Sequence, residues 1–188
     1  NRAAAPRLAR ESVPIAGAER AMLGLTLAVA LALRAILVLR SAAQDGAYIT
    51  YRYAVNLARS LGFVYSAGER VFGTSTPLFT LGLALGARLG ISPETAAPWI
   101  GVVCDVAIGL VGWFALRSHV DRSLAWLWLV FYATFYNALQ ACTYGMESQL
   151  FVLLLLGAML AFERRRFGWT GILVGVGFLV RVEAILVL

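Results

Sequence analysis

Residues 93–116 read PETAAPWIGVVCDVAIGLVGWFAL, and this stretch decides the fold class. Ser92 precedes it as a favourable N-cap, and Pro93 takes the first helical position, where proline is well tolerated. After Glu94 the only charged residue is Asp105, near the centre. The run is longer than the roughly 20 apolar residues that a helix needs to cross a bilayer. The stretch therefore predicts a membrane-spanning helix that carries one buried acid.

The composition of the whole chain also indicates a membrane protein. Of its 188 residues, 61% are hydrophobic and 14% are charged, and the mean hydropathy is +0.79. Soluble domains are about 45–50% apolar and about 25% charged, so a soluble enzyme is excluded. The 16 basic residues are all arginine, and the net charge is +6. In a membrane chain such residues set topology and contact lipid phosphates, so we expect membrane lipids rather than nucleic acid as partners.

The apolar runs predict an all-α, polytopic helical bundle with five or six membrane segments and one further helix at the membrane surface. The runs cover residues 21–39, 75–87, 93–116, 123–143, 147–162 and 168–188. We predict one transmembrane domain over 1–188, with a cytoplasmic tail at 1–20 and an extracytoplasmic loop at 40–74. Because the sequence opens without Met and stops inside an apolar run, we expect it to be part of a longer protein.

The distribution of arginines predicts the topology. If every run crossed the membrane, the arginines at 117–122 and 164–166 would lie outside, against the positive-inside rule. The conflict disappears if the 13-residue run at 75–87 does not cross, because it is shorter than a normal span. The tail, the 117–122 hinge and the 163–166 cluster then lie inside, and the 40–74 loop lies outside. A conventional crossing by 75–87 remains the alternative.

Residues 45–61 have the pattern of an amphipathic helix at the membrane surface. One stripe is apolar and consists of Ala47, Tyr51, Ala54, Ala58 and Leu61. The opposite side is polar and consists of Asp45, Tyr48, Arg52, Asn56 and Arg59. A carboxylate at the helix start, followed along the helix by guanidinium groups, supplies a candidate general base and candidate phosphate ligands. This polar face is the first candidate site, and a purely solvated face is the alternative.

The same region resembles the first periplasmic loop of the GT-C-fold glycosyltransferases. The matching segments are Asp45-Gly-Ala-Tyr-Ile-Thr-Tyr-Arg-Tyr-Ala54, Asn56-Leu-Ala58, Gly62-Phe-Val-Tyr65, Gly68-Glu-Arg-Val71 and Gly73-Thr-Ser-Thr-Pro-Leu78. Two later segments resemble further motifs of the group: Gly145-Met-Glu-Ser148 and Leu179-Val-Arg-Val-Glu-Ala184. The chain is most similar to bacterial cell-wall arabinofuranosyltransferases and their relatives, of which it would cover the amino-terminal half. It departs from their pattern at Gly46, where a second acid is usual, and at Val182, where proline is usual.

The resemblance implies a membrane enzyme that transfers a sugar from a polyprenyl-phosphate donor to a glycan or lipid acceptor by inverting displacement. It assigns Asp45 as the general base. The candidate donor and substrate residues are Tyr48, Arg52, Asn56, Arg59, Glu69, Arg70, Glu147, Arg181 and Glu183. The implied location is the bacterial cytoplasmic membrane, with the site on the extracytoplasmic face. We expect no tightly bound cofactor and no metal site. The sequence leaves open whether the reaction requires a divalent metal. It also leaves open whether a further chain or a carboxy-terminal part completes the protein.

Two other classes of function remain open. A transporter or lipid-binding accessory subunit would use the charges inside apolar runs, which are Arg34, Asp105, Arg181 and Glu183. A catalytically inactive homologue would account for Gly46. Arg34 is also a conceivable structural partner of Asp105, and Glu147 is equally suited to stabilise a helix N-terminus.

Overall fold

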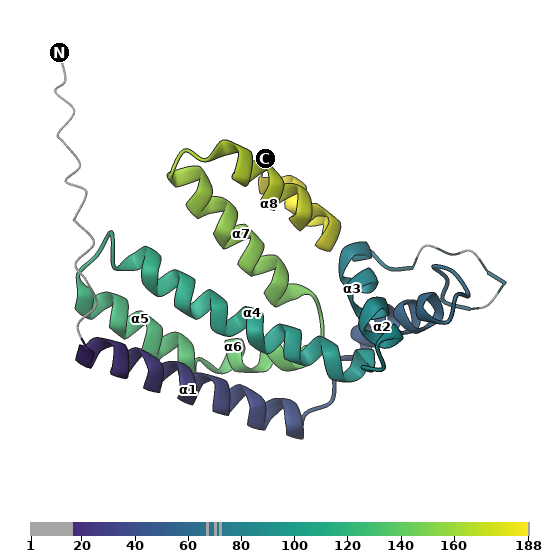
Figure 1. Cartoon of the computed structure of the whole chain (residues 1–188), viewed down its shortest axis with the longest axis horizontal. Helices are drawn as coiled ribbons and strands as arrows, with labels where there is room; N and C mark the ends of the chain where they lie inside the picture. Colours follow the sequence, from purple (N-terminus) through teal and green to yellow (C-terminus); the bar gives the residue numbers. More distant parts are fainter. Residues whose placement is uncertain (1–16, 67, 70, 72, 188) are drawn as a thin grey trace, which may run out of the picture.

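The computed structural model describes residues 17–66, 68, 69, 71 and 73–187, and this part of the chain is helical without strands. Figure 1 shows the order of the elements along the chain. The helices are α1 (Gly17–Arg40), α2 (Asp45–Ala58), α3 (Pro77–Arg88), α4 (Pro93–Leu116), α5 (Arg122–Thr134), α6 (Tyr136–Ala141), η1 (Cys142–Tyr144), α7 (Ser148–Glu163), α8 (Phe167–Val180) and η2 (Val182–Val187). The all-α prediction is confirmed for the described residues.

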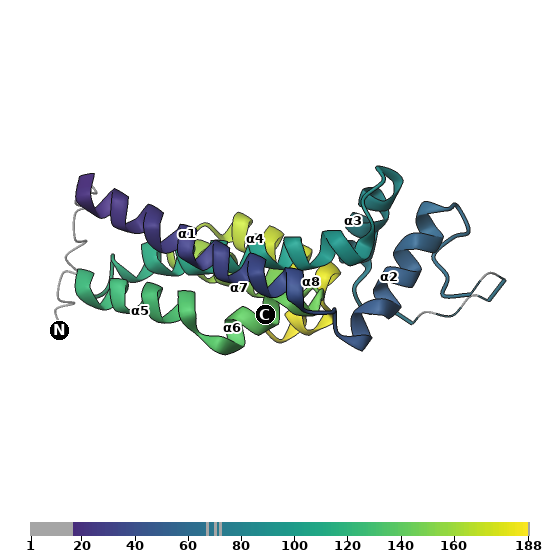
Figure 2. The ribbon, with the colours of Figure 1, turned by 90° about the horizontal axis from the view of Figure 1, so that it is seen from below.

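The long helix α4 is the centre of the bundle. Helices α1 and α5 pack along one side of it, α7 packs along another, and α8 packs on α7 (Figures 1 and 2). Helices α2 and α3 pack on each other beyond one end of α4. The predicted start of α4 is confirmed, because Pro93 is its first residue and the Ser92 side chain accepts a hydrogen bond of 3.3 Å from the Thr95 N–H.

Fewer helices have membrane-spanning length than the sequence predicted. Within the described residues, α1 and α4 are long and apolar enough to cross, and a third span exists if Tyr136–Thr143 and Ser148–Glu163, bent by 118°, count as one. The run at 123–143 is divided between α5 and α6, and the run at 168–188 leaves the α-helix after Val180. The 12-residue α3 and 14-residue α8 are each shorter than the roughly 17–25 residues of a normal span.

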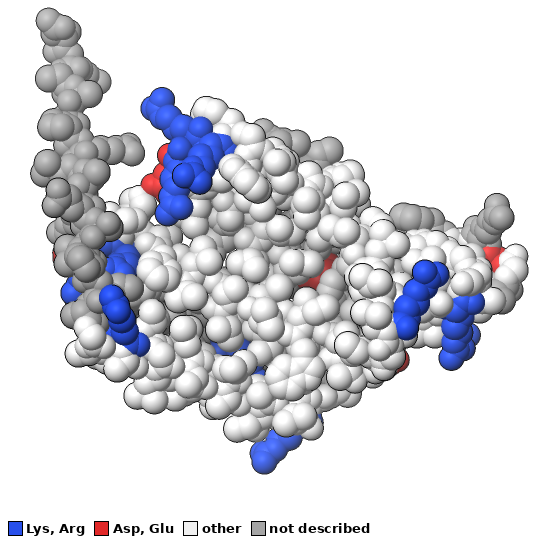
Figure 3. Space-filling model, viewed as in Figure 1, with Lys and Arg blue, Asp and Glu red and all other residues white. Residues whose placement is uncertain are grey.

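Two sets of turns lie at opposite ends of the bundle. Arg122 contacts Glu19 at 3.4 Å, and His119 contacts Glu163, so the start of α1, the α4–α5 turn and the α7–α8 turn share one end. We call it the hinge end. The opposite loop end holds α2, α3 and the turn before α7 (Figure 1). Arginines gather at both ends, while the face between them is mostly uncharged (Figure 3). Residues 1–16 of the predicted tail lie outside the described residues.

The apolar stripe of α2 is used inside the fold. Ala47, Tyr51 and Ala54 are buried against Phe79 and Leu83 of α3 and against α4. The sequence predicted that this stripe would face the membrane, but α3 covers it because the two helices form a hairpin-like pair. Of the other predicted stripe residues, Ala58 is half-buried and Leu61 is exposed. The helix is therefore amphipathic as predicted, with a protein surface in place of lipid.

Candidate functional site at the loop end

The start of α2 is held against the turn that precedes α7. The Gln44 N–H donates to the Tyr144 backbone oxygen at 3.1 Å, and the Tyr51 hydroxyl donates to the Gly145 backbone oxygen at 2.9 Å. Gly145 adopts a positive φ of 68°, which glycine tolerates without strain. Asp45, the first residue of α2, is exposed beside this contact. Two of the three predicted motifs are thus neighbours in space.

The third motif reaches the same turn through Arg181. Its Nε lies 3.8 Å from Oε1 of Glu147, a residue only 4% exposed, and its Nη1 donates to the Ser148 Oγ at 3.4 Å. Arg181 also contacts Glu183, with 3.2 Å between Nε and Oε1. The backbone N–H of Glu183 and the Arg181 charge together hold the pKa of the Glu183 carboxyl below its usual range.

The contact between Arg181 and Glu183 depends on the end of α8. Residues two apart on one helix point in different directions and would not face each other. They meet because α8 ends at Val180 and Arg181 is extended, with φ −157° and ψ 125°. This break occurs with Val182 in the position where the resembling family has proline. Helix α8 therefore ends at this point without a proline.

Arg181 contacts both Glu147 and Glu183, and Asp45 lies at the start of α2, which is hydrogen-bonded to the turn before Glu147. We call these four residues, three acids and one arginine, the loop-end cluster. A small acidic area is visible between α8 and α3 in Figure 3. Asp45 is exposed and suited to accept a proton, and a guanidinium has five N–H donors for an anionic group. Glu147 is the N-cap residue of α7 and forms no side-chain capping hydrogen bond. Its carboxylate instead lies beside Arg181.

The other arginines predicted to bind phosphate lie along α2, away from the cluster. Arg52 is exposed, and its Nε donates to the Tyr65 backbone oxygen at 3.4 Å. Arg59 is the exposed C-cap residue. With a rise of 1.5 Å per residue, Arg52 and Arg59 are about 10 and 21 Å along the helix from Asp45. One phosphate group cannot contact both Arg59 and the surroundings of Asp45.

The remaining predicted residues of α2 and its loop differ in burial. Tyr48 is exposed, and its ring packs edge-on against the buried Tyr51 ring with 5.4 Å between centroids. Asn56 is buried and donates through Nδ2 to the backbone oxygens of Val64 and Tyr65 at 2.9 and 2.8 Å. Glu69 is exposed in the loop. Arg70 lies outside the described residues.

Tyr53 is a structural residue that sequence reasoning did not single out. It is buried, its hydroxyl donates to the Val71 backbone oxygen at 2.6 Å, and it accepts from the Gly73 N–H at 2.8 Å. Together with Asn56 it fastens the loop to a second face of α2. The spacing of Tyr53 and Asn56, three residues apart on a helix, was the available signal.

The pairing that the sequence suggested for Asp105 is confirmed. Arg34 Nε lies 2.5 Å from Asp105 Oδ2, and both side chains are fully buried. This pair joins α1 to the middle of α4 and is separate from the loop-end cluster. Among the described residues, no three His, Cys, Asp or Glu side chains are grouped as a metal site would need.

The fold and the site define an all-helical chain with helices of membrane-spanning length and a polar cluster at one end of its bundle. Comparison with protein-family models, with curated proteins and with solved structures finds no match for this chain.

Proposed function

We propose that the protein is a membrane glycosyltransferase that transfers a sugar from a polyprenyl-phosphate donor to a cell-envelope acceptor. One observation carries the proposal: the three segments that resemble GT-C motifs meet at the loop end. The Tyr51 to Gly145 hydrogen bond joins the first to the second, and the contact of Arg181 with Glu147 joins the second to the third. Three segments that are separated by 34 or more residues along the chain are thus joined at one end of the bundle.

In the proposed reaction, the acceptor oxygen attacks the anomeric carbon of the sugar and its proton passes to the Asp45 carboxylate. The bond between the anomeric carbon and the phosphate oxygen breaks, and polyprenyl phosphate leaves with the electron pair. Arg181 is the guanidinium best placed to bind this phosphate, since it is the one that contacts the turn beside Asp45. Arg52 and Arg59, farther along α2, are assigned to more distant parts of the substrates or to lipid headgroups.

We place the protein in a bacterial cytoplasmic membrane with the loop end outside. Arginines are in excess at the hinge end, where Arg20, Arg117, Arg122, Arg164, Arg165 and Arg166 outnumber Glu19, Asp121 and Glu163. At the loop end the described arginines 40, 52, 59, 88 and 181 are matched by the acids 45, 69, 94, 147 and 183. Because cytoplasmic turns carry the excess of basic residues, this asymmetry favours a cytoplasmic hinge end.

Photolabelling with a benzophenone derivative of polyprenyl phosphate tests the donor site. The proposal predicts labelled peptides from 43–52 and 144–150, and weaker labelling of Arg181→Met. Arg88→Met is the matched control, because Arg88 is another arginine at the loop end and contacts the Leu57 backbone oxygen instead. Equal labelling of wild type and Arg181→Met, or label confined to α1 and α5, contradicts the proposal.

The transporter alternative has less support from the geometry than the enzyme. It relied on charges inside apolar runs, and Arg34 and Asp105 bind each other there. An inactive homologue would bind the donor without turnover, so a sugar-transfer assay on the intact protein separates it from the enzyme. Uptake of polyprenyl phosphate across a vesicle bilayer, without transfer, would favour the transporter.

A further inference from the structure

Helix α5 breaks at a level of the bundle where the surrounding helices are apolar. It ends at Thr134, Phe135 is extended with φ −65° and ψ 117°, and α6 starts at Tyr136. A helix end leaves carbonyl groups without helical partners. The break packs beside Asp105, which is twelve residues from Pro93 and so about 18 Å from the start of α4. No water is expected at such a depth in a bilayer, so these carbonyls need donors from the protein.

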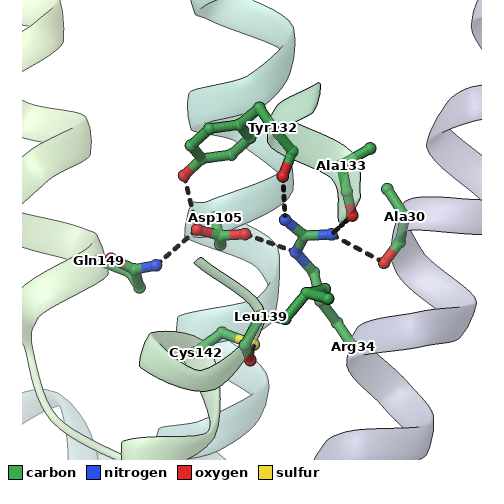
Figure 4. A network of polar contacts seen from close by, with 8 residues as sticks. All are labelled: Ala30, Arg34, Asp105, Tyr132, Ala133, Leu139, Cys142 and Gln149. Carbon is green, nitrogen blue, oxygen red and sulfur yellow. Dashed lines mark hydrogen bonds and ion pairs between the residues drawn. The ribbon is translucent and has the colours of Figure 1, made fainter. Parts of the chain in front are cut away.

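Arg34 supplies those donors from α1, as Figure 4 shows. Its Nη1 donates to the Ala133 backbone oxygen at 3.1 Å, and its Nη2 donates to the Tyr132 backbone oxygen at 3.4 Å. The same Nη1 also donates to the Ala30 backbone oxygen at 3.1 Å. The planar guanidinium thus caps the end of α5 while its Nε binds Asp105.

Asp105 extends the network to α5 and α7. Its Oδ1 accepts from the Tyr132 hydroxyl at 2.6 Å and from the Gln149 Nε2 at 2.5 Å. Gln149 is buried in the first turn of α7, two residues after Glu147. The network therefore contacts both sides of the segment 136–147, at the end of α5 and at the start of α7 (Figure 4).

We propose that Arg34 is a positioning residue for the loop-end cluster. By capping the broken end of α5 it holds segment 136–147 in its bent path, and this path places Gly145 and Glu147 beside the start of α2. The importance of the placement rests on the proposed function. The capping itself does not, and it is tested without catalysis.

A simple ion pair between α1 and α4 makes a different prediction. Replacing both members of a buried ion pair by apolar residues is often neutral for stability, because the cost of burying the charges disappears with them. Loss of the Arg34 N–H groups, by contrast, leaves the Ala133 carbonyl without its donor, and the Tyr132 carbonyl keeps only the 3.4 Å bond from the Phe135 N–H. The double variant R34M/D105L removes the ion pair together with the Arg34 donors. Because D105L also removes the acceptor of the Tyr132 hydroxyl and of Gln149, R34M/D105N, which keeps a side-chain oxygen for them, is made beside it and should show the same effects if lost capping is their cause.

The two native cysteines report the result. Cys142 is buried in η1, inside the positioned segment, and Cys104 is buried on α4, outside it. We expect R34M/D105L to raise the rate of N-ethylmaleimide labelling at Cys142 by roughly tenfold or more and to leave Cys104 protected. The matched control is R122M/E19L, which removes the ion pair between α1 and the start of α5 at the hinge end. It should leave Cys142 protected.

A crosslink measures directly whether the turn before α7 lies beside the start of α2. A Cβ on Gly46 would lie 4.0 Å from the Met146 Cε, so the pair G46C/M146C is within reach of a short bifunctional thiol reagent. In a background with both native cysteines changed to Ala, we expect R34M/D105L to lower the crosslink yield several-fold and R122M/E19L to leave it unchanged.

A conservative variant covers the case in which R34M/D105L does not fold. Arg34→Lys keeps a donor within reach of the α5 carbonyls, although it lacks the planar fork. Its Cys142 should be labelled more slowly than in Arg34→Met. Equal labelling of these two variants, or full Cys142 protection and crosslinking in R34M/D105L, overturns the positioning role. A result of either kind is independent of whether Asp45 catalyses sugar transfer.

Discussion

The Tyr51 hydroxyl is bonded to the backbone oxygen of Gly145 at 2.9 Å, across a separation of 94 residues in the chain. Burial is the main cause that raises the pKa of this hydroxyl, with smaller contributions from the charges of Tyr48 and Glu94. The group is therefore protonated at neutral pH and remains a donor. This bond joins the start of α2 to the turn before α7, and so it brings Asp45 and Glu147 to the same end of the bundle.

Gly145→Ala should destabilise the protein strongly. The new Cβ would lie 1.9 Å from the Tyr51 hydroxyl, and the positive φ of 68° costs a non-glycine residue about 1–2 kcal/mol by itself. Thermal unfolding in detergent measures the loss. Gly175→Ala is the control, since a Cβ there meets nothing within 4 Å in the interior of α8, and it should be neutral or slightly stabilising. Equal unfolding temperatures for the two variants contradict this account of the turn.

Tyr51→Phe should partly rescue Gly145→Ala, although alone it costs about 1 kcal/mol for the lost hydrogen bond. The reason is that removal of the hydroxyl frees the space that the Ala methyl group needs. A double-mutant cycle by unfolding measures the coupling. Tyr48→Phe removes an exposed hydroxyl from the neighbouring ring and should rescue nothing. If the changes in unfolding free energy of Tyr51→Phe and Gly145→Ala simply add in the double variant, this explanation is wrong.

Asn56→Asp should loosen the loop after α2 without unfolding the helices. The variant replaces the N–H groups that bind the Val64 and Tyr65 backbone oxygens with a carboxylate, which repels them. Hydrogen exchange of residues 62–66 should become faster, while exchange in α4 stays slow. Ser41→Asp, at an exposed position just after α1, is the control for the added charge. Unchanged exchange at 62–66 would mean that other contacts hold the loop.

Gly46→Asp should be tolerated and slightly stabilising. A Cβ at this position meets only the Met146 Cε at 4.0 Å, and an acid in the first turn of a helix gains about 0.3–1 kcal/mol from the helix dipole. Gly46→Ala separates this charge effect from the general gain on replacing a helical glycine. Unfolding of the three proteins should give the order Asp, Ala, Gly from most to least stable. Strong destabilisation by Asp would show that the start of α2 has no room for the second acid of the resembling family.

The sequence predicted the elements whose determinants are local. The Ser92 cap and Pro93 define the start of α4, and the spacing of Ala47, Tyr51 and Ala54 predicted an apolar stripe on α2. The arginines predicted that the 117–122 hinge and the 163–166 cluster lie on one side of the membrane, and the contact of His119 with Glu163 places both at one end of the bundle. The side of the membrane stays a prediction.

The features that sequence reasoning missed depend on distant residues. The run at 123–143 has no glycine or proline, and yet α5 ends at Thr134, where Arg34 binds its last carbonyls from about a hundred residues away. The end of α8 at Val180 likewise lacks a local breaker in the next residues. Tertiary packing places α3 over the apolar stripe of α2. Periodicity identifies an apolar stripe, but it does not show whether lipid or another helix covers it.

Sugar transfer by Asp45→Asn in the intact protein tests the central claim most directly. Turnover with a polyprenyl-phosphate-linked sugar should fall by roughly 10²–10⁴-fold, the usual contribution of a general base, while photolabelling by the polyprenyl-phosphate probe is retained. Asp121→Asn, an exposed acid at the hinge end, should keep wild-type turnover. Unchanged turnover by Asp45→Asn would contradict the assignment of the loop-end cluster as the active site.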